Sequence, residues 1–219
     1  FGRATGGILD VRLARLQPEG VGGQLDVSIL DTSLYLEAPL GDKASIAISG
    51  RRSYLDFIID AVASAVDSDS LNVVVAPRYY DGQLLLKYRP LPGHAIRLFG
   101  LFSDDRLELL FNNPGEASLT LEGGDFETRT GFYRGIAEYE YTPSETLSNQ
   151  LRVSLGSDQG RFKLFQFEAD QHQESVQVRD SLSWRFAPDF ALQLGVDHRS
   201  TRSDYDVTVP LPEPQPDGF

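Results

Sequence analysis

Residues 175–197 read SVQVRDSLSWRFAPDFALQLGVD, and this stretch decides the fold. Apolar side chains occupy every second position up to Phe186, as in a β-strand with one apolar face, and only Asp180 breaks the set. A tight turn follows at Ala187-Pro188-Asp189, and a second alternating run begins over residues 192–197. The pattern predicts an antiparallel hairpin.

Three further hairpins of this kind are predicted upstream. Their short turns are Pro39-Leu40-Gly41-Asp42, Pro90-Leu91-Pro92-Gly93 and Thr142-Pro143-Ser144-Glu145. Roughly 45 to 55 residues separate successive short turns, which is enough for two tilted membrane strands of about 10 residues and a large loop. This regular exchange of tight and long connections is typical of an outer-membrane barrel, because one rim faces the periplasm and the other faces the outside.

The alternation also predicts irregular features between these turns. In the first hairpin it shifts by one residue near Leu30-Asp31, which favours a β-bulge. Residues 54–66 have a helical pattern and predict a short helix within a loop. We expect exposed outer loops over Arg51–Pro77, Ser103–Thr130 and Gly156–Gln173, and the start of another over Pro210–Phe219. In the third of these, a short alternation at Phe162 and Leu164 is consistent with a strand that extends into the loop.

Composition limits the function classes. No run of about 18 apolar residues occurs, so a helical membrane protein is excluded, whereas barrel strands show only every second residue to lipid. The net charge of −12 argues against a nucleic-acid partner. The chain has no cysteine and its three histidines lack ligand spacing, so we expect no metal and no cofactor.

No catalytic motif is present, and we expect no enzymatic activity. Candidate ligand or lumen contacts are Arg51, Arg52, Tyr79 and Tyr80. For the two arginines, a solvated rim position is an equally good interpretation. The acidic pairs Asp67/Asp69 and Asp104/Asp105 suit calcium by residue type, but solvated loop acids are the more economical interpretation.

The opening stretch FGRATGGILDV, residues 1–11, resembles the end of the plug domain in TonB-dependent outer-membrane receptors. In that family, an aromatic-Gly-Arg-x-x-Gly-Gly-x-(Ile/Leu)-(Asn/Asp)-Val stretch precedes the first barrel strand. The matching plug-exit residues are Gly2, Arg3, Gly6 and Gly7. The stretch Gly50-Arg51-Arg52-Ser53-Tyr54-Leu55 is similar to a recurring segment of large family members. Relative to the family pattern, the sequence lacks the transducer-binding box, most of the plug and the later strands.

The resemblance implies an all-β fold, an antiparallel transmembrane β-barrel segment with about eight strands of a barrel of about 22. Residues 1–20 would be the C-terminal end of the plug domain and residues 21–219 the N-terminal part of the barrel. The implied function is that of a receptor in the cell outer membrane. It would bind a scarce extracellular ligand (siderophore, cobalamin, glycan or peptide) and import it to the periplasm. Its partners would be outer-membrane lipid, that ligand and a TonB-type energy transducer acting through the missing N-terminal region.

Two alternatives stay open. A complete eight-stranded outer-membrane anchor or adhesin would fit the strand count. A soluble β-barrel binding module would also show alternation, but its apolar side chains would face inward. Side-chain direction separates the readings: the soluble module requires Leu182, Trp184, Leu192 and Leu194 in a dry centre.

Overall fold

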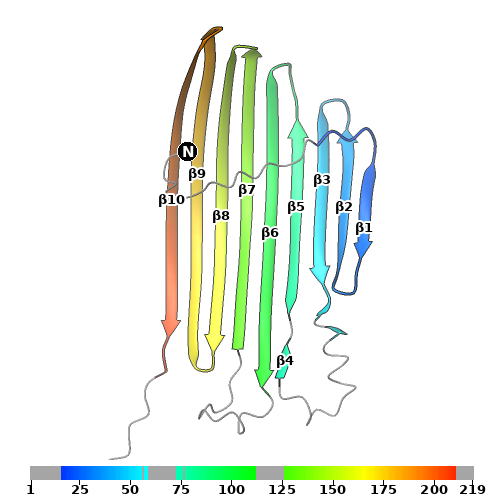
Figure 1. Cartoon of the computed structure of the whole chain (residues 1–219), viewed down its shortest axis with the longest axis vertical. Coiled ribbons are helices and arrows are strands. Elements are labelled where there is room, and N and C mark those ends of the chain that lie inside the picture. The colour runs from blue at the N-terminus through cyan, green and yellow to red at the C-terminus, as the bar shows by residue number, and fades with distance from the viewer. Residues whose placement is uncertain (1–15, 56, 59–72, 76, 112–125, 211–219) are drawn as a thin grey trace, which may run out of the picture.

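The computed structural model describes residues 16–55, 57–58, 73–75, 77–111 and 126–210. These residues form one antiparallel sheet in which nine strands are hydrogen-bonded in the order β1-β2-β3-β5-β6-β7-β8-β9-β10, with the short β4 on the end of β6 (Figure 1). The strands are β1 Gly22–Val27, β2 Asp31–Leu40, β3 Ala44–Ser53, β4 Val73–Val75, β5 Arg78–Tyr88, β6 His94–Phe111, β7 Phe126–Ser144, β8 Leu147–Leu164, β9 Phe167–Ala187 and β10 Phe190–Thr208.

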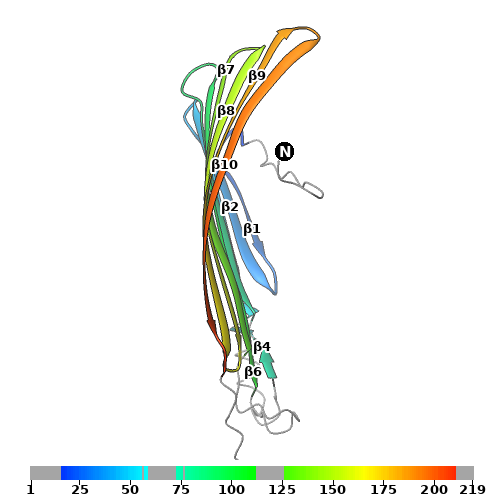
Figure 2. The same cartoon turned by 90° about the vertical axis from the view of Figure 1, so that its left-hand side faces the viewer.

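The sheet is a single curved layer, as Figure 2 shows edge-on. It is open, because β1 and β10 do not pair with each other in the described residues. The accessible surface is 16200 Å², whereas a globular protein of 24.3 kDa would expose about 10,000 Å². Leu16 and Ala47 are the buried hydrophobic residues among those described, so this layer has no core of its own.

The four predicted short turns are confirmed. They connect β2 to β3, β5 to β6, β7 to β8 and β9 to β10, and all four lie at one edge of the sheet, uppermost in Figure 1. We call this end of the strands the short-turn edge and the opposite end of the strands the far edge. Glycine serves the first two turns directly, because Gly41 and Gly93 have φ angles of 69° and 76°.

The predicted bulge near Leu30-Asp31 is wrong, because the chain turns there and forms two strands, β1 and β2. The backbone amide of Ser28 donates to the carbonyl of Asp31 at 2.9 Å. The Ser28 hydroxyl also accepts the amides of Leu30 and Asp31 at 3.1 and 3.0 Å. A serine side chain that closes a local turn produces the same phase shift in the sequence as a bulge.

In the residues that the structure describes, two predicted outer loops are largely strand. The segment 103–130 continues as strand to Phe111 in β6 and from Phe126 in β7, and 156–173 is interrupted only by the turn at Phe165-Gln166. The apolar alternation does end in these segments. The strands nevertheless continue, and cross-strand ion pairs stabilise them, for example Arg106 with Glu127 at 3.0 Å.

The predicted helix over 54–66 falls mostly outside the described residues. Its first turn is present, because the amide of Ile58 donates to the carbonyl of Tyr54 at 3.2 Å. The predicted loop over Pro210–Phe219 lies outside the described residues from position 211 onward.

Candidate functional site: the two faces of the sheet

Strand register divides the side chains between two faces, because residues paired across neighbouring strands point to the same side. We call a line of such paired residues a row. One face, the apolar face, carries a band of aliphatic and aromatic side chains. In β5 to β8 the band comprises Leu84, Leu86, Tyr88, Ile96, Leu98, Phe102, Tyr133, Ala137, Tyr139, Tyr141, Leu147, Leu151, Val153 and Leu155.

The band extends to both sides of these strands, and many of its side chains are exposed. Its members elsewhere are Leu34, Leu36, Leu40, Ile46 and Ile48 in β2 and β3, and Val176, Val178, Leu182, Trp184, Leu192, Leu194 and Val196 in β9 and β10. Trp184 is 48% exposed and Leu194 is 56% exposed. The predicted alternation is thus confirmed, and its apolar side does not form a dry centre.

Aromatic rings border the band on both sides. Near the short-turn edge, Tyr141 contacts His94 at 4.7 Å and Trp184 contacts Phe186 at 5.5 Å, both measured between ring centroids. Toward the far edge, Phe102 contacts Tyr80 at 6.3 Å and Tyr133 at 6.4 Å. We call the rings of Tyr80, Phe102 and Tyr133 the far aromatic border.

The short turns are staggered along the strands. The first two lie level, since Ala44 and Tyr88 share a row. That row continues to Tyr139, from which β7 runs five residues further to Ser144. The third turn is therefore displaced.

The fourth turn is displaced again. Leu147 pairs with Trp184, and β9 runs three residues beyond Trp184 to Ala187. A stagger of roughly eight residues over six strand spacings tilts the line of turns by roughly 40° from the perpendicular to the strands, at about 3.3 Å per residue and 4.8 Å per strand.

The far border of the apolar band slopes in the same sense. It passes through Tyr80 in β5, and the row of Tyr80 reaches Asp204 in β10. In β10, however, the apolar set ends at Val196, eight residues closer to the short-turn edge. Across five strand spacings this shift gives roughly 45°. Two independent features, turns and side-chain polarity, thus define the same oblique direction.

The opposite, polar face carries a continuous charged row across six strands. Its members are Lys87, Arg97, Glu138, Arg152, Arg179 and Asp197. Glu138 is only 8% exposed and accepts hydrogen bonds from both Arg97 and Arg152, the latter at 2.9 Å from Nε. The row is satisfied internally, because Arg179 also donates to Asp197 at 2.8 Å.

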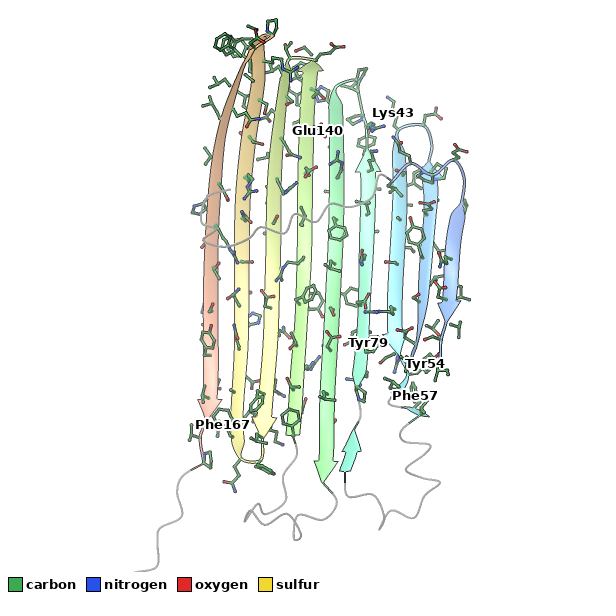
Figure 3. The ribbon with its side chains drawn as sticks, viewed as in Figure 1. Lys43, Tyr54, Phe57, Tyr79, Glu140 and Phe167 are labelled. Carbon is green, nitrogen blue, oxygen red and sulfur yellow. The ribbon has the colours of Figure 1, made fainter. Side chains whose placement is uncertain are left out.

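A second polar cluster joins β2, β3 and β5 on the polar face near the far edge; Figure 3 labels its member Tyr79. The Tyr79 hydroxyl donates to Asp31 at 2.7 Å, and Arg51 Nε donates to Asp81 at 2.7 Å. The Arg51 guanidinium lies 5.0 Å from the centre of the Tyr79 ring. The amide of Tyr79 donates to the buried hydroxyl of Ser53 at 2.9 Å.

The contacts in this cluster alter its titration. The hydrogen bond from Tyr79 lowers the pKa of Asp31, with smaller contributions in the same direction from Ser28 and Arg51. The same bond raises the pKa of Tyr79, because losing its proton beside a carboxylate is unfavourable. The hydrogen bond to Asp81 raises the pKa of Arg51. The cluster is therefore a preformed charged surface with one cation and two carboxylates.

The chain segment before β1 contacts the polar face. Lys87 Nζ donates to the carbonyl of Leu16 at 3.4 Å, and Leu16 is only 6% exposed. Since Lys87 belongs to the charged row, the segment that enters the sheet at β1 passes over the same face that carries the charges.

The structure separates the predicted contact residues. Arg51 and Tyr79 lie on the polar face, whereas Arg52 and Tyr80 pair with each other on the apolar face, so the four do not line one surface. Arg52 instead lies over the ring of Phe57 at 5.2 Å. The predicted plug-exit residues Gly2, Arg3, Gly6 and Gly7 fall outside the described residues.

Sequence reasoning missed an aromatic cluster at the far edge of the polar face. Phe162 contacts Phe126 at 5.7 Å and Phe167 at 6.0 Å, both edge-on. These rings lie in segments that the polarity of the surrounding sequence marked as loops. The period-two spacing of Phe162 and Leu164 was the available signal.

Comparison with protein-family models, curated proteins and solved structures finds no match. In the ranges that the structure describes, no three histidine or acidic side chains are grouped to hold a metal ion. Those ranges also contain no helix with the length and apolarity needed to cross a membrane.

Proposed function

We propose that this chain forms part of the wall of an outer-membrane β-barrel that acts as a TonB-dependent receptor. In this proposal the apolar face contacts lipid and the polar face lines a lumen. The receptor binds a scarce extracellular ligand above the membrane and imports it to the periplasm when the energy transducer acts. No covalent chemistry is required.

The oblique apolar band is the observation that carries the proposal. Its eleven residues from Val176 to Phe186 extend roughly 33 Å along β9, which gives a height of roughly 25 Å for a strand tilted by roughly 40°. Transmembrane barrels have this height, this tilt and aromatic borders at both interfaces. A soluble sheet of the same size would need a second layer to cover the band.

The direction of the charges supports a lumen on the other side. The charged row lies level with the band but on the opposite face, where a plug or water would solvate it. Contact of Leu16 with Lys87 on this face suits a plug that ends just before β1. The receptor assignment itself depends on the resemblance of residues 1–11 to a plug exit.

The cluster of Asp31, Arg51, Tyr79 and Asp81 is the proposed ligand-facing surface. It lies on the polar face beyond the band, at the level where a lumen opens to the outside. The Phe126, Phe162 and Phe167 rings border the same face further out. Charged and aromatic groups together suit a polar ligand with planar parts, and they leave its identity open among the four classes.

Topology can be tested by cysteine labelling, because the chain has no cysteine of its own. Single variants Gln166→Cys at the far edge and Asp189→Cys at the short-turn edge would be made in the complete polypeptide that contains this sequence. With a membrane-impermeant maleimide, we expect Gln166→Cys to react in intact cells and Asp189→Cys only after permeabilisation. The reverse pattern, or protein recovered in the soluble fraction, would refute the proposal.

Import can be tested separately. Uptake of siderophores, cobalamin, oligosaccharides and peptides would be measured in cells with and without the polypeptide and with and without the energy transducer. We expect one ligand class to require both. A correctly inserted protein whose presence changes no transducer-dependent uptake would favour the anchor or adhesin alternative.

A further inference from the structure

Four arginines form one row on the apolar face, beyond the far aromatic border. They are Arg78, Arg106, Arg129 and Arg161, on the neighbouring strands β5, β6, β7 and β8. Directly paired side chains have Cβ atoms about 5 Å apart, and like charges at this distance are destabilising without counter-ions. We call these residues the arginine row.

The surface around the arginine row is positively charged, whereas the whole chain has a negative net charge. Beyond the band on β3 to β8, the apolar face carries six cations, Arg52, Arg78, Arg106, Arg129, Arg161 and Lys163, and three acids, Asp104, Glu108 and Glu127. On β9 and β10 the same level carries one arginine, Arg202, and five acids, Glu168, Asp170, Glu174, Asp204 and Asp206. A positive sector therefore stands out in a chain of net charge −12.

Internal acids satisfy only part of the arginine row. Arg129 is paired with Asp104 at 2.5 Å and Arg161 with Asp170 at 2.7 Å. Arg78 makes no ion pair with another described residue, and its shielded Nε has no hydrogen-bond partner among them. Arg106 forms ion pairs with Glu127 at 3.0 Å and with Glu108 at 3.2 Å, but its Nε is not aligned for a hydrogen bond. Each guanidinium has five N–H donors, so Arg78 and Arg106 retain free ones.

The position of the row indicates which anion it would meet. Arg78 lies two residues, or about 7 Å along the strand, beyond Tyr80 of the far aromatic border. If the band is in lipid, this is the headgroup level of the outer leaflet. Guanidinium groups bind phosphate with two parallel hydrogen bonds.

We propose that Arg78 and Arg106 bind a phosphate group of the glycolipid in the outer leaflet, with its acyl chains against the apolar band below. The proposal rests on the proposed membrane orientation but adds a site that does not depend on the imported ligand. An isolated phosphate would gain the ion pairs alone, whereas a phosphorylated glycolipid gains the apolar contacts as well. The lipid is therefore the favoured occupant.

The test uses the complete polypeptide purified from outer membranes in mild detergent. Retained phosphorylated glycolipid per protein would be quantified by native mass spectrometry for the wild type, Arg78→Gln, and Arg78→Gln with Arg106→Gln. We expect a loss of about three-fold for the single variant and about ten-fold for the double variant, which correspond to about 0.7 and about 1.4 kcal/mol of binding free energy. Arg202→Gln, on the same face in the acidic sector, is the matched control and should retain wild-type lipid.

A second arm distinguishes the sources of phosphate. Delipidated wild-type protein would be titrated with diphosphorylated lipid A, its dephosphorylated form and inorganic phosphate, with the thermal unfolding temperature as readout. We expect only the phosphorylated lipid to raise that temperature, and the Arg78→Gln variant to need about three-fold more of this lipid for the same rise. Because Arg78 has no acidic partner among the described residues, this variant leaves none of them unpaired and keeps the test valid if the double variant fails to fold.

Equal lipid retention in all variants, or an equal response to the dephosphorylated lipid, would overturn the proposed site. An equal response to inorganic phosphate would replace the lipid by a free anion and so overturn it too. The heat-modifiable band of an inserted barrel is recorded on the same samples. Inserted protein without arginine-dependent lipid refutes only the site, whereas protein that never inserts refutes the membrane orientation as well.

Discussion

At the residue scale, Asp180 is the acidic residue that interrupts the apolar band on β9. It is exposed in the middle of the band on β9, between Val178 and Leu182, and its carboxylate accepts a hydrogen bond from Asn149 at 2.8 Å. If the apolar face contacts lipid, as proposed, this carboxylate faces hydrocarbon, which is costly. We therefore expect Asp180→Leu to raise the free energy of unfolding in lipid by about 1–2 kcal/mol.

Urea unfolding of the complete polypeptide in liposomes measures this effect. The matched control is Asp197→Leu on the polar face, which removes the acceptor of Arg179 and Gln177 and should lower stability. A destabilising Asp180→Leu would show that this face is not in lipid.

The hydrogen bond between Tyr79 and Asp31 predicts a specific pH dependence. Asp31 titrates below its unfolded value of about 3.9, so its contribution is present above about pH 4 and is lost as pH falls through the folded pKa. Tyr79 titrates above its unfolded value of about 10, so its contribution is present below about pH 10 and is lost as pH rises through the folded pKa.

The stability difference between wild type and Tyr79→Phe should therefore be constant from about pH 5 to pH 9 and shrink at both extremes. Urea midpoints measured across this range would show it. A difference that changes near neutral pH would mean that another group controls the contact.

The sequence predicted single residues of the site less well than the faces. Period-two alternation already separates Arg51 from Arg52 and Tyr79 from Tyr80, whereas residue type alone groups the four together. The partners of Arg51 were not predictable, because Asp31 and Asp81 come from different strands whose register depends on a turn at Ser28. The arginine row also required register, since its members lie 23 to 32 residues apart along the chain.

At the scale of elements, the short turn between β5 and β6 is the most sensitive. Gly93 has φ of 76°, and a Cβ there would lie 2.5 Å from the carbonyl oxygen of Thr142. Gly41 in the first turn has φ of 69° but open space around it. We expect Gly93→Ala to cost about 2–3 kcal/mol and Gly41→Ala about 1 kcal/mol, because only the first adds a backbone clash to left-handed strain.

The two glycine variants would be compared by urea unfolding in the same lipid. Equal losses would mean that the turn against Thr142 can relax. The comparison is informative because both positions lie at the same edge and share the left-handed conformation.

The four hairpins were predictable from alternation and proline-containing turns, because both are local signals. The extent of the strands was not. β6 to β10 continue for 18 to 21 residues, well beyond the apolar band, and the continuation is stabilised by ion pairs such as Arg161 with Asp170. Hydrophobic patterning does not predict these segments as strands, because both of their faces are largely polar.

At the scale of the whole molecule, the open sheet leaves two exposed faces of opposite character. Its accessible surface of 16200 Å² is large and few of its apolar side chains are buried. Such a sheet requires something else that covers its two faces. Lipid on the apolar face and a plug or water on the polar face satisfy both. Further strands on the bare edges of β1 and β10 would satisfy their backbone groups.

Site-directed spin labelling of β8 tests this arrangement most directly. Single labels at residues 149–156 in the complete polypeptide, reconstituted in lipid, would be scanned for collisions with oxygen and with a polar nickel chelate. We predict that labels at 151, 153 and 155 favour oxygen, which concentrates in hydrocarbon, and that labels at 150, 152 and 154 do not. The opposite phase, or no period of two, would contradict the assignment of the apolar face to lipid.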